Sequence, residues 1–225
     1  MSARVRITYW SDPLCIWAYL AHDKLQRLRQ RFGADIAIEH RIVPVFGSVP
    51  ERFRSGAWSK GGPKSRASRT AEIAKAHGHP EVDGACWLRD APASSWSPAS
   101  AIKAVDLLAQ EGAIAPDAPG DFTQALRAAF FCDHLNIARR DVQQRVAEAL
   151  TLPWPRIQAR LDDGRALAAL WEDHAEREAR RVQGSPTWSF DDGRAMLYGN
   201  VSERVLQATV AELLGGTSPG GSACT

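Results

Sequence analysis

Residues 9–18, which read Tyr-Trp-Ser-Asp-Pro-Leu-Cys-Ile-Trp-Ala, join a predicted strand to a predicted helix. The strand covers Arg4–Trp10, where apolar and polar residues alternate as a half-buried strand requires. Asp12 is expected to cap the helix and Pro13 to occupy its first position, where a missing N–H costs nothing. Apolar residues then recur at alternating spacings of four and three, which predicts a single amphipathic helix ended by Gly33. They are Leu14, Ala18, Ala21, Leu25, Leu28 and Phe32.

A second strand is predicted from Ile36 to Val43, stopped by Pro44. A strand, a helix and a strand in this order require a parallel pair with the helix crossing over it. The following segment, from Gly47 to Gly164, shows helical patterns separated by Pro and Gly. The predicted helices cover residues 65–77, 98–111, 121–134, 139–150 and 154–161.

The last third of the chain returns to a mixed pattern. A long helix is predicted over Ala166–Arg181, and two short strands over Thr187–Phe190 and Ala195–Tyr198. An Asp-Gly turn between these strands indicates a hairpin. A final helix is predicted from Val201 to Leu214, with Asn200 as its cap.

This order predicts an α/β fold in which a thioredoxin-like core is interrupted by an all-helical insertion. Residues 1–46 and 182–214 would form the core. Residues 47–181 would form the insertion, including the long helix that returns to the core. The Gly- and Ser-rich residues 215–225 are expected to be a flexible tail.

The composition excludes several functional classes. The chain of 225 residues has a formal net charge of +2, which gives no reason to expect a nucleic acid or a membrane as partner. No apolar run approaches the roughly 20 residues of a membrane span, and the N-terminus has no secretory pattern, so we expect a cytoplasmic protein. None of the four cysteines, at 15, 86, 132 and 224, forms a C-x-x-C pair, and a disulfide framework is not expected.

Cys15 is the main candidate for chemistry. It lies in the first turn of the predicted helix, where free backbone N–H groups and the helix dipole stabilise a thiolate. A thiolate is the nucleophile for thiol exchange and for attack on electrophilic carbon. The alternative is that Cys15 is a small apolar residue without a role.

The second candidate is the segment Gly184-Ser185-Pro186-Thr187, between the long helix and a strand. A proline that begins a strand after small residues could follow a cis peptide bond. The N–H and C=O of Ser185 would then turn outward and could pair with a peptide-like ligand. Considered alone, the segment is better explained by an ordinary trans proline at a strand start.

Together these motifs resemble the DsbA-like thioredoxin superfamily. The closest resemblance is to the branch with FrnE-type oxidoreductases, 2-hydroxychromene-2-carboxylate isomerases and kappa-class glutathione transferases. The similar segments are residues 9–18, 184–187 and Tyr198-Gly199-Asn200, in the same order along the chain.

The resemblance implies that Cys15 occupies the place of the reactive first cysteine, or of the catalytic serine in the glutathione enzymes. It implies substrate-binding roles for Trp17, Ser185, Pro186 and Asn200. Ala18 occupies the place of the second, resolving cysteine, and its presence excludes a dithiol reaction within this motif.

We therefore predict a DsbA-like thiol oxidoreductase that uses a single thiol in thiol–disulfide or glutathione-linked exchange. The alternative is a glutathione-dependent isomerase or transferase acting on an aromatic or polyketide-like substrate. Neither hypothesis needs a tightly bound cofactor, and glutathione could serve as cosubstrate. The expected partner is a small thiol or disulfide, and a homodimer is compatible with the sequence.

Three further features have two interpretations each. His77, His79 and Cys86 lack the spacing of a structural zinc site, so no metal is predicted. The basic segment Phe53–Arg69 could close over an anionic substrate or form a solvated loop. Cys224 could approach Cys15 from the tail, although a tail cysteine without a role is the simpler expectation.

Overall fold

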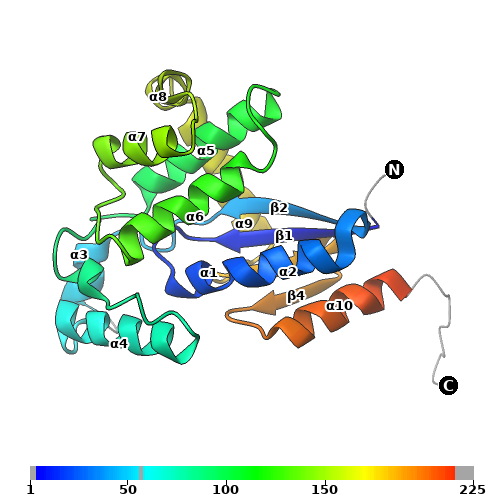
Figure 1. The fold of residues 1–225 in the computed structure, drawn as a ribbon, viewed down its shortest axis with the longest axis horizontal. Helices are drawn as coiled ribbons and strands as arrows, with labels where there is room; N and C mark the ends of the chain where they lie inside the picture. The colour runs from blue at the N-terminus through cyan, green and yellow to red at the C-terminus, as the bar shows by residue number, and fades with distance from the viewer. Residues whose placement is uncertain (1–3, 56–57, 216–225) are drawn as a thin grey trace.

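The computed structural model describes residues 4–55 and 58–215. Its centre is a four-stranded sheet in the order β2-β1-β3-β4 (Figure 1). The strands are β1 (Val5–Ser11), β2 (Ile36–Ile42), β3 (Thr187–Phe190) and β4 (Ala195–Tyr198). β1 is parallel to β2 and antiparallel to β3, and β3 is antiparallel to β4. The parallel pair and the hairpin are both as the sequence predicted.

The connection between β1 and β2 contains two helices rather than the single predicted helix. They are α1 (Ile16–Leu20) and α2 (His22–Phe32). Ala21 lies between them, with its backbone in the right-handed helical region at φ −77° and ψ −10°. Gly33 follows α2 with a positive φ of 49°, which agrees with its predicted role in ending the helix.

Among the described residues, seven α-helices lie within the segment predicted as the insertion, whose limits stay a prediction. They are α3 (Val49–Arg54), α4 (Gly62–Ala76), α5 (Trp96–Gln110), α6 (Ala118–Phe131), α7 (Arg140–Ala149), α8 (Trp154–Asp162) and α9 (Arg165–Ala179). α3 was not predicted, although Ser48 caps it by accepting a hydrogen bond from the Glu51 N–H. Short 3-10 turns cover Gly33–Asp35, Ala85–Trp87 and Asp191–Gly193.

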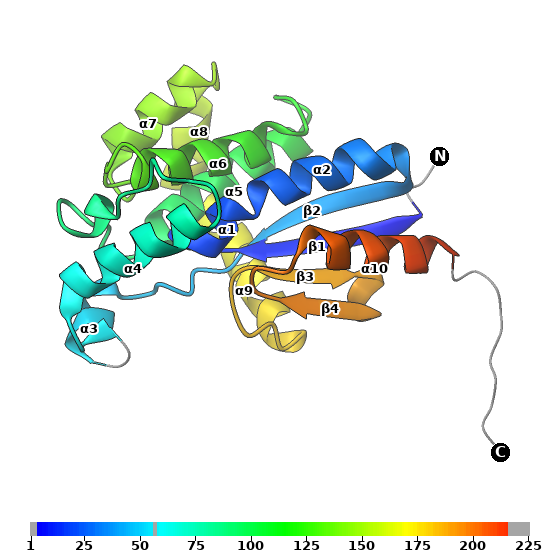
Figure 2. The same cartoon turned by 60° about the horizontal axis from the view of Figure 1, so that its bottom comes forward.

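The two faces of the sheet are covered by different helices. α2 and α10 (Glu203–Gly215) pack on one face, whereas α9 lies behind the other (Figures 1 and 2). Buried residues on the first face include Ile7, Tyr9, Leu25, Leu28, Trp188, Phe190, Leu206 and Val210. Gly215 ends α10, and the rest of the predicted tail, with Cys224, lies outside the described residues. No described helix is long and apolar enough to cross a membrane.

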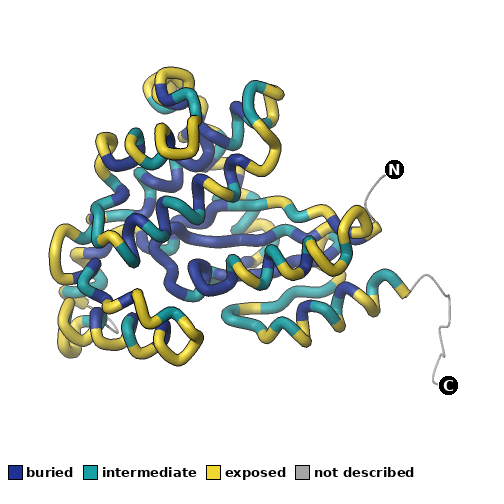
Figure 3. Tube along the Cα trace, in the orientation of Figure 1, coloured by how far each residue is buried: buried dark blue, intermediate teal, exposed yellow. Residues whose placement is uncertain are grey.

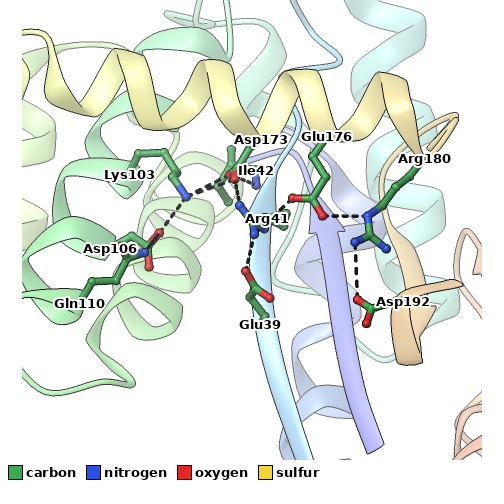
Figure 4. A network of polar contacts seen from close by, with 10 residues as sticks. All are labelled: Glu39, Arg41, Ile42, Lys103, Asp106, Gln110, Asp173, Glu176, Arg180 and Asp192. Atoms are coloured by element: carbon green, nitrogen blue, oxygen red, sulfur yellow. Dashed lines mark hydrogen bonds and ion pairs between the residues drawn. The ribbon is translucent and has the colours of Figure 1, made fainter.

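A buried carboxylate joins α9 to the edge strand β2 (Figure 4). The Asp173 side chain is fully buried and accepts hydrogen bonds from the Ile42 N–H at 2.9 Å and from Arg41 at 2.8 Å. It also forms an ion pair of 3.1 Å with Lys103, which is 4% exposed and comes from α5. Asp173 thereby holds the insertion against the sheet.

We expect the substitution Asp173→Ala to lower the free energy of unfolding by about 3–5 kcal/mol. The reason is that Lys103 would keep its buried charge but lose a partner, which is the costly way to break a buried ion pair. Urea denaturation measures this change. The matched control is Glu72→Ala, which removes an exposed ion pair with Arg69 and should cost less than about 1 kcal/mol. Equal effects of the two substitutions would contradict the assignment.

Candidate active site

The turn between β1 and α1 places Cys15 at the start of the helix. α1 begins at Ile16, and Cys15 is its N-cap residue, with φ −86° and ψ 114°. The expectation that Asp12 caps this helix and that Pro13 is its first residue is wrong. Asp12 instead closes the preceding turn, since its Oδ1 accepts from the Leu14 N–H at 2.6 Å and its C=O accepts from the Cys15 N–H at 3.2 Å.

The Cys15 thiol faces the loop that contains Pro186. The thiol donates a hydrogen bond to the Ser185 C=O, with the two atoms 3.2 Å apart. The Ser185–Pro186 peptide bond is cis. The Ser185 Oγ accepts from the Asp12 N–H at 2.8 Å, so that two hydrogen bonds join the loop to the turn. The structure thus brings together three of the residues proposed for the site, from segments about 170 residues apart.

The site is closed in this structure. Cys15 is 5% exposed, and every residue from Tyr9 to Ile16 is buried (Figure 3). This burial raises the pKa of the Cys15 thiol above its ordinary value, although hydrogen bonds from Ser185 and Ala18 oppose the change. The expectation of a lowered pKa fails here because the loss of water outweighs the helix N-terminus.

Sequence reasoning missed Arg127, a buried cation beside this turn. Arg127 lies on α6, is 2% exposed, and donates to the Ser11 Oγ at 2.7 Å and to the Asp12 C=O at 3.4 Å. No described carboxylate lies within ion-pair distance of it. Its charge lowers the pKa of Cys15 and so favours the thiolate. The available signal was a lone arginine on the apolar face of a predicted helix, within the run Leu126–Phe131.

Asp12 is the acidic group of the site. Its carboxylate is fully buried, and the Oδ2 accepts from the Ser95 Oγ at 2.7 Å and from the Phe46 N–H at 3.1 Å. Burial raises the pKa of Asp12 to about 6, while these hydrogen bonds act in the opposite direction. Ser95 belongs to the predicted insertion and Phe46 lies just before it, and their part in the site was not evident from sequence because both are far from Asp12 along the chain.

Ala18, in the place of a second cysteine, is completely buried, and its C=O accepts from the Tyr9 hydroxyl at 3.5 Å. Among the described residues, Cys86 and Cys132 are free thiols, like Cys15. The Cys132 Sγ lies 3.3 Å from the Tyr19 hydroxyl. Cys15 is therefore the thiol that meets the Pro186 loop.

Asn200 lines a separate, small cavity, and Trp17 contacts His77, another residue of its wall. The half-buried Trp17 ring contacts the His77 ring at a centroid distance of 5.4 Å, and the His77 Nε2 lies 3.3 Å from the Asn200 Nδ2. Asn200 also accepts a hydrogen bond from Lys24. A cavity of about 140 Å³ is lined by Asn200, His77, Lys24 and neighbouring residues, but not by Cys15.

The predicted helix-capping role of Asn200 is wrong. α10 begins at Glu203, and the Ser202 Oγ accepts from the Val205 N–H at 3.4 Å. The Asn200 side chain is instead engaged with Lys24, which holds it away from the end of the helix.

The basic segment after β2 contains a stack of arginines and aromatic rings. The Arg66 guanidinium lies 4.3 Å from the Trp58 ring centroid and 5.1 Å from that of Trp87. Arg52 lies over Phe46 at 4.9 Å and over Trp58 at 5.3 Å. Burial lowers the pKa of Arg66, and its electrostatic interaction with Cys15 acts in the opposite direction. This part of the segment is packed near the thiol rather than solvated.

No group of three or more His, Cys, Asp or Glu residues within 4–55 and 58–215 is placed to hold a metal ion. His77 and His79 instead contact aromatic rings: His77 contacts Trp17, and His79 contacts Tyr19 at a centroid distance of 5.5 Å.

Comparison with solved structures shows the fold. The chain matches no protein-family model, and no curated protein matches it significantly. A putative protein disulfide isomerase from Nitrosomonas europaea aligns over 95% of this chain and 99% of its own, with a TM-score of 0.78 and 14% identity. The cytosolic disulfide reductase DsbM from Pseudomonas aeruginosa, matched also in a structure with GSH, aligns over 92% of this chain and 99% of its own (TM-score 0.66, 19% identity).

A 2-hydroxychromene-2-carboxylate isomerase aligns over 93% of this chain and 96% of its own, with a TM-score of 0.66 and 18% identity. The chain therefore shares the fold of these structures, an α/β, DsbA-like thioredoxin fold with helices inserted, and the predicted fold class is confirmed. Identities this low establish the fold and not the reaction.

We expect the Cys15 thiol to titrate above the ordinary cysteine value of about 8.5, because its burial disfavours the thiolate. The substitution Arg127→Met should raise this pKa further, since it removes a cation that lowers it. The rate of iodoacetamide labelling as a function of pH, followed on the Cys15 peptide by mass spectrometry, measures the pKa of Cys15 in the wild type and in Arg127→Met. The control is the labelling of Cys132, which Arg127→Met should leave unchanged. An unchanged Cys15 profile in Arg127→Met would show that the cation has no influence on the thiol.

The raised pKa of Asp12 makes stability depend on pH. Below pH 3.8, the pKa of this group in the unfolded chain, Asp12 is protonated in both states and its ionisation does not change the free energy of unfolding. Above about pH 6, its pKa in the folded chain, Asp12 is ionised in both states, and the full cost of burying its charge lowers the free energy of unfolding. We expect the wild type to lose up to about 3 kcal/mol relative to Asp12→Asn as pH rises from 4 to 7, because one pKa unit corresponds to about 1.36 kcal/mol. Urea titrations of both proteins across this range test it. If the difference in free energy of unfolding between the two proteins stays constant with pH, the raised pKa of Asp12 is contradicted.

Proposed function

We propose that this chain is a DsbA-like enzyme that uses Cys15 alone in glutathione-linked thiol–disulfide exchange. The observation that carries the proposal is the contact of 3.2 Å between the Cys15 thiol and the Ser185 C=O, beside the cis peptide bond at Pro186 and with buried Ala18 in the second cysteine position. The disulfide reductase and disulfide isomerase among the structures of similar fold support this class of reaction.

The proposed reaction has two exchange steps. The Cys15 thiolate attacks a mixed disulfide between substrate and glutathione, so that a bond forms between Cys15 and the glutathione sulfur while the substrate leaves as a thiolate. The proton released from Cys15 neutralises that leaving thiolate. A second glutathione thiolate then attacks the Cys15 adduct, which restores Cys15 and releases oxidised glutathione. Overall, the mixed disulfide and one free glutathione thiol are converted into the substrate thiol and oxidised glutathione, so that one disulfide bond is exchanged for another.

The absence of a cysteine at position 18 determines which products form. A neighbouring thiol would resolve the adduct internally, whereas Ala18 leaves it to a second glutathione. The adduct should therefore persist whenever free glutathione is scarce. A reducing compartment such as the cytoplasm, which supplies this thiol, suits the proposed cycle.

A glutathione-dependent isomerase or transferase is the second candidate, and two observations favour it. Burial raises the pKa of Cys15, so that the group is placed to donate through its S–H, as it does to Ser185. In this role it would hold the sulfur of bound glutathione. The stack of Arg66 with Trp58 and Trp87 near Cys15 suits a planar, anionic substrate. One structure of similar fold is an isomerase.

We expect treatment with oxidised glutathione to add one glutathione at Cys15, detected by mass spectrometry of the intact chain and its peptides. Cys86→Ser and Cys132→Ser are the matched controls and should leave this adduct unchanged. In Ala18→Cys the adduct should be replaced by an intramolecular disulfide between positions 15 and 18. Failure of Cys15 to form an adduct at any pH up to 9 would overturn the exchange mechanism.

The two candidates differ in what Cys15→Ser does. A serine hydroxyl cannot form a mixed disulfide but can donate a hydrogen bond to a bound thiolate. Exchange with a glutathionylated peptide should therefore be lost in both Cys15→Ser and Cys15→Ala. If glutathione binding measured by calorimetry survives in Cys15→Ser and is lost in Cys15→Ala, the isomerase or transferase proposal is favoured instead.

A further inference from the structure

A second cavity, of about 500 Å³, lies along the free edge of the sheet and shares no residue with the Cys15 site. Its wall combines β2 residues 38–41 with residues of α2, α5, α9 and the start of α6. A volume of this size is typical of sites that hold small ligands. The proposed exchange reaction makes no use of it.

The backbone of β2 offers unpaired hydrogen-bonding groups to this cavity. β2 is the edge strand, and the Ile42 N–H on its free side donates to the Asp173 carboxylate instead of to another strand. N–H and C=O groups of alternate residues in a strand point to the same side. The main-chain groups of Ile38 and His40 therefore also point to the free edge, and both residues line the cavity.

The side chains of the cavity wall add donors. The Arg29 guanidinium lies 3.2 Å from the His40 Nε2, which must accept because arginine only donates; the proton of neutral His40 is therefore on Nδ1. Burial and Arg29 lower the pKa of His40 to about 3, which keeps the ring neutral. The His40 Nδ1 and the Arg41 Nε are buried without a hydrogen-bond partner among the described residues.

The acidic side chains of the cavity wall are either paired with a cation or exposed. Asp106 is paired with Lys103 at 2.7 Å, and Glu39 with Arg41 at 2.7 Å (Figure 4). Asp117 and Glu172 are exposed residues. Arg29, in contrast, is half-buried and has no described carboxylate within ion-pair distance. One cation is thus available to a ligand anion, and the exposed carboxylates are available to a ligand cation.

We propose that this cavity binds a short peptide in extended conformation through its free C-terminal carboxylate. The peptide backbone adds to the edge of β2 by pairing with the main-chain groups of Ile38 and His40. Its terminal carboxylate pairs with the Arg29 guanidinium, which has no described carboxylate within ion-pair distance. Its ammonium group or a basic side chain meets Asp117 or Glu172.

The test uses the full-length protein, labelled with ¹⁵N, and the peptide Ala-Ala-Ala with either a free or an amidated C-terminus. We expect the free acid to shift the backbone amide signals of Ile38, His40 and Arg41. Arg29→Gln should weaken binding by at least about tenfold, because hydrogen bonds to charged groups contribute more than neutral ones. Arg31→Gln, an exposed arginine on the same helix, is the matched control and should bind as the wild type does.

A second variant keeps the test informative if Arg29→Gln fails to fold. A Cβ added at Gly120, which lines the cavity, would lie 3.8 Å from the His40 Nε2, an ordinary van der Waals contact, and we expect Gly120→Leu to place its side chain in the cavity. It should fold and lose peptide binding. The proposal is overturned if the free acid causes no shift at millimolar concentration, if acid and amide bind equally well, or if the shifts cluster at Cys15. Glutathionylation of Cys15 is unaffected by each of these outcomes and is measured separately.

Discussion

The hydrogen bonds of Asp12 are the constraint on which the candidate site depends. The Asp12 N–H reaches Ser185, one carboxylate oxygen holds Leu14, and the other holds Phe46 and Ser95. One residue thereby joins the end of β1, the Pro186 loop and the insertion. The thiol lies where these three parts meet, because the turn that Asp12 closes leads directly to Cys15.

The same arrangement sets the reactivity of the thiol through two opposing effects. Removing water from Cys15 disfavours its charged form, while the buried cation of Arg127 favours it. A guanidinium that is 2% exposed and has no described carboxylate in contact is costly to bury. A thiolate at Cys15 would supply an anion near it, so that ionisation of the thiol reduces this cost. A substrate that displaces the Cys15–Ser185 hydrogen bond would shift the same balance.

The fold could be predicted from sequence because its signals are local. Period-two alternation located β1, and the Asp-Gly turn located the hairpin of β3 and β4. The boundary at Cys15 was missed because Asp12 and Pro13 favour a helix start, whereas contacts of Asp12 with Ser95 and Phe46 hold it in a turn. The role of Arg127 was missed for a similar reason: its partners Ser11 and Asp12 come from a distant segment, and the local signal was only a lone arginine on an apolar helix face.

A thioredoxin-like sheet with β2 at its edge leaves one row of main-chain groups without partners. In this chain the insertion covers only part of that row, since Asp173 of α9 takes the Ile42 N–H while residues 38–41 border the larger cavity. The helical insertion therefore has two structural consequences at once. It reaches the turn before Cys15 through the hydrogen bond from Ser95 to Asp12, and it borders the free edge of β2 without forming strand pairs with it. The insertion leaves both the Cys15 thiol and the edge of β2 available. A ligand at the first site would bind the thiol, and a ligand in the cavity would bind the strand edge.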